Sequence, residues 1–170
     1  MHILAIDPGT TESGFCYLDA ADMRPKRHGK AENESVIGMA RSAEYGEAVV
    51  IERLASYGMP VGKEVLETCE WVGRFTEAAC RAGKTVYYVY RKDEKLEICQ
   101  SPKANDATIR RALIDRFAQR DLKSGKGTKA NPDWFYGFAK DAWQAYAVAV
   151  TWADKYRRDQ EDAEKDRAQL

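Results

Sequence analysis

The apolar run Ala48–Ile51 is followed at once by Glu52, and this run limits most strongly how the chain can fold. A short, continuous run of such residues is typical of a strand buried on both faces. A strand of that kind needs other structure packed on both sides of its sheet. The chain has 170 residues, enough to supply those layers within one domain. The run therefore predicts an α/β fold with helices on both sides of a sheet.

Other segments supply the rest of this fold. Strand patterns cover residues 2–6, 14–19, about 28–33 and 85–90, and helical patterns cover 33–43, 63–82, 105–117 and 139–156. The resulting order, β-β-β-α-β-α-β-α-α, predicts a mixed five-stranded sheet flanked by helices in a domain spanning residues 1–153. We expect Asn33 and Asn105 to cap the helices that begin there, and the loop 122–132, with its glycines and lysines, to be mobile. We expect the charged segment 154–170 to be a tail, either a helical extension or disordered.

Composition excludes several kinds of site and location. The four cysteines form no C-x-x-C pair, and histidine occurs only at positions 2 and 28, so neither a zinc motif nor a multi-histidine site is indicated. Apolar runs fall far short of the roughly 18 residues that span a membrane. The first residues, MHILAIDPG, lack the pattern of a signal peptide. We therefore expect a cytoplasmic protein that does not enter a membrane.

Three carboxylates stand at the ends of elements that should be buried. Asp7 ends the first strand, Glu52 ends the run described above, and Asp141 opens the alanine-rich last helix. Each has a simpler interpretation, as a turn residue, a surface ion-pair partner or a helix cap, respectively. If the first and fourth strands are neighbours, however, the three carboxylates converge. Such a set suits Mg²⁺ or Mn²⁺ rather than zinc.

Charge and apolar patterning suggest two surfaces. Between Ser101 and Asn131 the chain has eight basic and three acidic residues, although its formal net charge is zero. That cluster indicates either a solvated surface or a contact with polyanions. The helix 63–82 has two apolar stripes, so it packs against the sheet and a second subunit, or it is simply a buried helix.

Three segments, "LAIDPGTTESGF", "VVIERLASYGMPVGKEVLETCEWVGRF" and "GFAKDAWQAYAVAV", resemble the RuvC-type Holliday junction resolvases of the ribonuclease H-like superfamily. The segments resemble the compact phage-encoded RuvC-like group in particular. The resemblance covers most of residues 1–153. It implies a homodimer, formed here through helix 63–82, that binds four-way DNA junctions and cuts two strands symmetrically with divalent metals. It assigns the metal-site carboxylates to Asp7, Glu52 and Asp141. A phage-encoded protein would act in the cytoplasm of its host.

The sequence departs from that family at one position. Such resolvases usually have four metal-site side chains, with an Asp or His one helical turn before the last carboxylate. Here that position is Phe138; if Asp141 is instead the earlier member of the pair, the later position is Gln144. Neither can supply a charge, so the number of bound metals stays open. Lys140 or Lys103 would assist the transition state electrostatically.

The resemblance also implies a reaction and its contacts. Mg²⁺, with Mn²⁺ as a substitute, would activate water for phosphodiester cleavage and leave a 5′-phosphate and a 3′-hydroxyl. Tyr57 and Met59, on the loop after Glu52, would wedge into the junction centre. Phosphate contacts would come from the basic cluster, namely Lys103, Arg110, Arg111, Lys123, Lys126 and Lys129.

Two segments also resemble nucleotide-binding motifs. "AIDPGTTESGF" also resembles the phosphate loop of sugar kinases and actin-like ATPases, but those enzymes need two such lobes and this chain supplies one. "SGKGTK" lacks the order of residues in a P-loop. A nuclease for forks or flaps remains an alternative, as does a non-catalytic junction-binding module with a decayed site.

Overall fold

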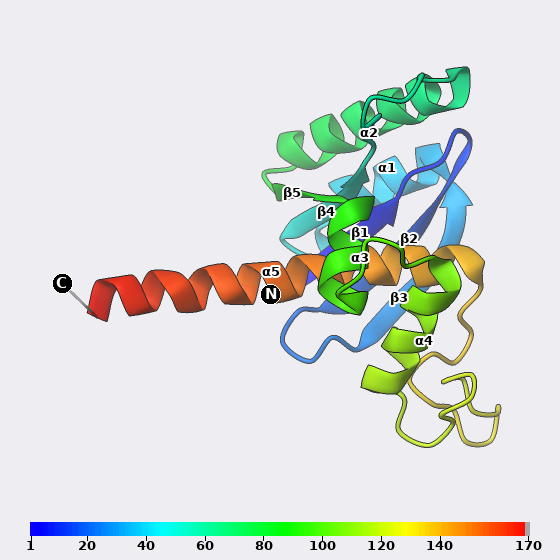
Figure 1. Cartoon of the computed structure of the whole chain (residues 1–170). Coiled ribbons are helices and arrows are strands. Elements are labelled where there is room, and N and C mark those ends of the chain that lie inside the picture. The colour runs from blue at the N-terminus through cyan, green and yellow to red at the C-terminus, as the bar shows by residue number, and fades with distance from the viewer. Residues whose placement is uncertain (169–170) are drawn as a thin grey trace.

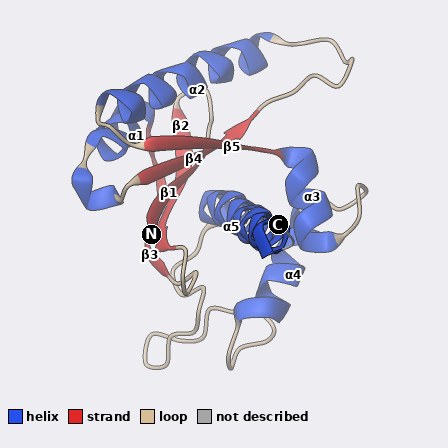
Figure 2. Ribbon diagram, turned by 90° about the vertical axis from the view of Figure 1, so that its left-hand side faces the viewer, coloured by secondary structure: helices blue, strands red, loops and turns tan. Residues whose placement is uncertain are grey.

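In the computed structural model, which describes residues 1–168, a five-stranded mixed sheet lies between two layers of helices (Figures 1 and 2). The strands are β1 (His2–Asp7), β2 (Glu12–Asp19), β3 (Pro25–Glu32), β4 (Ala48–Arg53) and β5 (Thr85–Tyr90). The helices are α1 (Asn33–Arg41), the short 3-10 turn η1 (Ala43–Tyr45), α2 (Lys63–Arg81), α3 (Arg91–Cys99), α4 (Asp106–Phe117) and α5 (Lys140–Ala168). The predicted fold class is confirmed.

The strands lie in the order β3-β2-β1-β4-β5. β1, β2 and β3 form an antiparallel meander, and β4 and β5 run parallel to β1. Figure 2 shows α1 and α2 on one face of the sheet and α5 on the other. The apolar run that begins β4 is fully buried, because helices cover both of its faces.

Alternation along β1 and β4 divides their side chains between two cores. Leu4 and Ile6 of β1 pack with the core beneath α1 and α2, whereas Ile3 and Ala5 pack with the core beneath α5. β4 follows the same alternation in register, with Ile6 opposite Ile51. The next residues on the two strands, Asp7 and Glu52, therefore face α5. They are two of the three predicted carboxylates.

Helix α5 packs closely on the sheet, as its alanine content predicts. Contacts run from α5 to β1 and β2, and its alanines at positions 142, 145, 147, 149 and 153 are buried. The helix continues well beyond the predicted residue 156, through Ala168, so the described part of the predicted tail is helical. Residues 169–170 of that tail lie outside the described residues.

Three details differ from the sequence prediction. Helix α3 fills residues 91–99, where no element was predicted. Asn33 was expected to cap α1 but is the first residue of that helix; its amide donates to the Gly9 carbonyl and its oxygen accepts from Ser13, tying the β1–β2 turn to α1. The buried face of α2 combines Val72 and Ala79 from one predicted stripe with Phe75 and Ala78 from the other, and adds Thr68, which belongs to neither.

Segment 122–132 was expected to be mobile because of its glycines and lysines, but two aspartates bind the backbone of the loop that contains it. Asp133 accepts hydrogen bonds from the backbone N–H groups of Gln119, Arg120, Asp121 and Trp134. Asp121 accepts from the backbone of residues 123, 124 and 127. These charge-assisted bonds hold the pKa of both carboxyl groups below its usual range. Across the described part of the chain, no helix is long and apolar enough to cross a membrane.

Candidate active site

Asp7 and Glu52 lie side by side at the carboxyl ends of β1 and β4. They occupy the positions that follow the paired residues Ile6 and Ile51. Glu52 is 9% exposed. Burial, the charge of Glu52 and a hydrogen bond between the two carboxyl groups raise the pKa of Asp7 to about 8. Burial and the charge of Glu94 raise the pKa of Glu52 to about 7. Without a cation, the pair therefore retains a proton near neutral pH.

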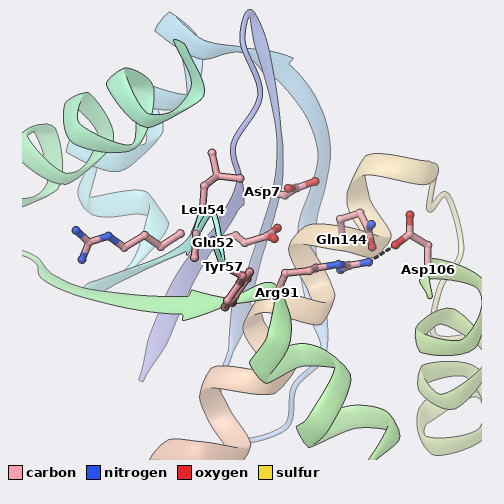
Figure 3. A pocket seen from close by; sticks show the side chains of 9 residues that line it. Asp7, Glu52, Leu54, Tyr57, Arg91, Asp106 and Gln144 are labelled. Atoms are coloured by element: carbon pink, nitrogen blue, oxygen red, sulfur yellow. Dashed lines mark hydrogen bonds and ion pairs between the residues drawn. The ribbon is translucent and has the colours of Figure 1, made fainter. Parts of the chain in front are cut away.

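A pocket of about 350 Å³ opens beside this pair (Figure 3). Such a crevice, outside the carboxyl ends of parallel strands, is where α/β proteins commonly bind ligands. Charged and polar side chains from five elements and one loop line it: Asp7, Glu52, Arg53, Tyr57, Arg91, Asp106 and Gln144, together with Leu54 and Ala55.

Helix α3 adds two charged side chains that the sequence analysis missed. The helix begins directly after β5, where the Asp93 carboxylate accepts a hydrogen bond from the Tyr90 backbone N–H. This start brings Arg91 into the pocket and buries Glu94 beside Arg91. Arg91 donates to both Glu94 and Asp106, and Figure 3 shows its side chain extending toward Asp106. Its positive charge lowers the pKa of Asp7, Glu52 and Glu94 against the effect of burial.

Asp141 lies near the pair but does not line the pocket. It is half-buried in the first turn of α5, and its charge contributes to the raised pKa of Asp7. Its backbone packs against Gly14, which is the β2 partner of Asp7. Lys140 is exposed and begins the helix. The structure thus brings two of the three predicted carboxylates together and places the third beside them.

The structure distinguishes the two alternatives for the fourth position. Phe138 precedes α5 and is buried among aromatic rings that include Phe135, Trp143 and Tyr146, so it lies in the core. Gln144, one turn after Asp141, lines the pocket. Gln144 is therefore the neutral residue at the position of the fourth metal-site side chain.

The carboxylate oxygens at the pocket are of the type that binds a hard divalent cation, but they are not arranged around one point. Among the described residues, no three acidic, histidine or cysteine side chains are grouped so that they could hold one ion as they stand. Carboxylate oxygens nevertheless dominate the site, and Oε1 of Glu94 is buried without a hydrogen-bond partner. Oxygen donors of this kind suit Mg²⁺ or Mn²⁺. Coordination would require Asp141 or Glu94 to move toward the pair.

The predicted DNA-contacting residues occupy three regions around the pocket. Tyr57 is 63% exposed at its rim and Met59 is 71% exposed on the same loop. Lys103 and Arg110 are exposed near the N-terminal end of α4, and Arg110 stacks on Trp143 of α5. Arg111 forms an ion pair with Asp115. The remaining three lie on the α4–α5 loop, where Lys123 and Lys129 are exposed and Lys126 is half-buried.

Two further basic residues near the pocket were not predicted from the sequence. Lys92 and Lys95 of α3 line a hollow next to the pocket, together with Tyr57, Arg91 and Pro102. The charge run in "RKDEKLEIC" is not distinctive in sequence, and only the placement of α3 brings it to the site.

No family model and no curated protein matches the sequence. Solved structures do match its fold. RuvC from Thermus thermophilus aligns with a TM-score of 0.70 at 16% identity, over 93% of this chain and 96% of that one. The chain has the RuvC fold. A second structure, T. thermophilus RuvC in complex with a Holliday junction substrate, aligns with a TM-score of 0.67 at 16% identity over the same shares of the two chains. In this RuvC fold, the pocket opens at the carboxyl ends of β1 and β4.

Proposed function

We propose that this protein is a Mg²⁺-dependent crossover junction endodeoxyribonuclease, which resolves four-way DNA junctions by paired, symmetric nicks. The adjoining carboxyl groups of Asp7 and Glu52, at a pocket in a RuvC fold, carry this proposal. A RuvC of this fold has been solved with a Holliday junction substrate, which favours the same substrate here. Such an enzyme would act in DNA recombination and repair. An origin in a phage, with action in the host cytoplasm, remains a prediction from the sequence resemblance.

Asp7, Glu52 and Asp141 would hold the metal. A bound Mg²⁺, for which Mn²⁺ would substitute, would lower the pKa of water and stabilise negative charge at a phosphate. The resemblance to resolvases implies products with a 5′-phosphate and a 3′-hydroxyl. The carboxyl groups must first release the proton that burial and mutual repulsion retain on Asp7 and Glu52. Lys140, beside Asp141, and Lys103 would stabilise charge developing on the scissile phosphate.

The basic residues would position the DNA arms. Lys103, Arg110 and Arg111 lie on or just before α4, whose N-terminal residue Asp106 lines the pocket. The helix has 12 residues, so at 1.5 Å per residue its other end lies about 17 Å away. Lys123, Lys126 and Lys129 follow that end and would contact phosphates at a distance from the scissile bond. Figure 1 shows their loop beyond α4.

Tyr57 and Met59 would enter the opened centre of the junction. Both side chains are among the most exposed large hydrophobic ones in the described structure. Tyr57 has a positive φ of 47° and its side chain lines the pocket. An exposed apolar pair beside the scissile site is suited to stacking on unpaired bases.

A homodimer would form through α2. This helix lies at the outer edge of the molecule, on the face of the sheet opposite α5 (Figure 1). Its outward side carries Leu66, which is 57% exposed, and the exposed small residues Cys69, Gly73 and Cys80. Their spacing places them on one helical face, which a second copy would cover. Two such subunits would present two active sites, as paired nicking requires.

A binding-only module is the second candidate, because Gln144 is neutral and no three ligands are grouped among the described residues. A nuclease for forks or flaps would use the same site. One experiment separates these functions: labelled four-way junctions, forks, flaps and linear duplexes are incubated with Mg²⁺ or EDTA, and the cut positions are mapped. Symmetric nicks confined to the junction and absent in EDTA would support resolution. Tight junction binding without cleavage in Mg²⁺ or Mn²⁺ would contradict it.

A further inference from the structure

Glu94 is a buried acidic residue, and one of its two carboxylate oxygens has no hydrogen-bond partner. Its side chain is 0% exposed. Oε2 accepts a hydrogen bond from Arg91, whereas Oε1 has no hydrogen-bond partner. The described residues contain one other buried side-chain polar atom without a partner, the Thr151 hydroxyl. A buried carboxylate normally has all its oxygens bonded, so a free oxygen indicates a missing partner.

The carboxylate of Glu94 acts on the pair at the strand ends. Its negative charge acts on Glu52. Glu94 and Asp7 also interact electrostatically. Glu94 therefore lies close enough to influence both carboxylates, and it approaches them from α3 rather than α5.

Gln144 of α5 lines the pocket that Arg91, the hydrogen-bond partner of Glu94, enters from α3. Its amide lines the pocket with Asp7 and Glu52, at the position where resolvases of the resembled family would carry a charge. α3 and α5 pack against each other, so a carboxylate on α3 can serve a site that α5 leaves one charge short. Figure 3 shows Arg91, the hydrogen-bond partner of Glu94, in the pocket together with Gln144.

We propose that Glu94 supplies the fourth carboxylate of the metal site and takes the place of the charge that Gln144 lacks. Oε1 is the atom available to the cation, directly or through water, and Oε2 stays held by Arg91. Arg91 then acts as a positioning residue, because a ligand fixed by a second partner loses less freedom on binding. This inference rests on the proposed function, since the cation is the one that the reaction uses.

A purely structural role for Glu94 leads to different expectations. In that case the carboxylate would serve only to neutralise Arg91, and removing its charge would destabilise the fold without affecting metal affinity. Glu94→Gln tests this directly, because glutamine keeps the side-chain volume and can still accept a hydrogen bond from Arg91. Glu97→Gln is the matched control: it lies on the same helix and pairs with Arg158 of α5, outside the pocket.

The test is isothermal titration of the full-length protein with Mn²⁺, together with thermal unfolding in EDTA. We expect Glu94→Gln to weaken Mn²⁺ binding by about tenfold or more, while Glu97→Gln binds like the wild type. We also expect the double variant Glu94→Gln/Gln144→Asp to recover affinity, because the charge returns from the other helix. No structural role of Glu94 explains such a rescue.

Two results would overturn the inference. One is Mn²⁺ affinity in Glu94→Gln equal to that of the wild type, with a lower unfolding temperature in EDTA. The other is a loss of affinity that Gln144→Asp does not restore. Either can occur while the wild type still binds Mn²⁺ and cuts junctions, so the proposed function would stand. A wild type that neither binds Mn²⁺ nor cuts would instead remove the proposed function itself.

Discussion

The carbonyl oxygen of Asp141 lies 2.5 Å from the position that a Cβ atom would take on Gly14. Gly14 is also the β2 partner of Asp7. Because Gly14 has no side chain, the start of α5 can approach the sheet at the β2 position that pairs with Asp7. This contact brings Asp141 close enough for its charge to act on Asp7.

Gly14→Ala should displace the start of α5 and separate these carboxylates. Overpacking of this kind destabilises a fold by about 1–3 kcal/mol, and misplacing a catalytic group by about 1 Å can cost on the order of a hundredfold in rate. We expect junction cleavage to fall at least tenfold and the unfolding temperature to drop. Gly38→Ala is the control, because nothing lies within 4 Å of its Cβ position on α1. If Gly14→Ala cuts at the wild-type rate, close packing at Gly14 does not position the site.

The stability of the metal-free protein should fall as the pH rises from about 4 to 8. Asp7 and Glu52 have raised pKa values, about 8 and about 7, so between pH 4 and 8 the folded state binds more protons than the unfolded state. The free energy of unfolding then decreases with pH across that window. Thermal unfolding in EDTA measures this trend.

Asp7→Asn should flatten the same pH profile, because it removes the titrating group without emptying its space. It should also raise the unfolding temperature in EDTA at pH 8, where the wild type carries the buried charge. Added Mn²⁺ should stabilise the wild type more at pH 8 than at pH 6 and should have little effect on the variant. Identical pH profiles for the two proteins would show that Asp7 ionises normally.

Charge reversal at Lys123, Lys126 and Lys129 should weaken junction binding and reduce its salt dependence. Each lost phosphate contact lowers the slope of log K against log salt by about 0.9 on duplex DNA. Filter binding at several salt concentrations measures that slope. Arg81→Glu is the control, because Arg81 is exposed at the end of α2, across the sheet from α5. An unchanged slope in the triple variant would mean that the loop faces away from DNA.

Leu66→Glu should convert the proposed dimer into a monomer. A charge on the exposed α2 stripe would have to be buried between two copies. Sedimentation at micromolar concentration measures the mass. Leu122→Glu on the α4–α5 loop is the control, because the exposed fraction of Leu122 is 59% and that of Leu66 is 57%. A wild type that sediments as a monomer would contradict the dimer outright.

Sequence alone could predict the carboxylate pair, because strand ends follow from local patterns. Asp7 and Glu52 each directly follow a buried apolar run, and parallel pairing of those runs brings them together. The sheet was predictable for the same reason. Strand 85–90 matches its predicted bounds, and Asn105 caps α4 as expected, accepting from the Thr108 backbone N–H.

Arg91 and Glu94 could not be found in this way. The segment that carries them is charged at most positions, and its burial depends on packing against α5 rather than on a periodic apolar face. The choice between Phe138 and Gln144 likewise depended on tertiary contacts. An aromatic cluster buries the first, and the start of α5 turns the second toward the pocket.

The most direct test measures junction binding and junction cleavage in one sample, with wild type and Asp7→Asn side by side in Mg²⁺. If Asp7 holds the metal and the basic surface holds the DNA, the variant will bind the labelled four-way junction with nearly wild-type affinity and produce no nicks, whereas the wild type will cut two strands symmetrically. Symmetric cleavage by Asp7→Asn at the wild-type rate would contradict the account.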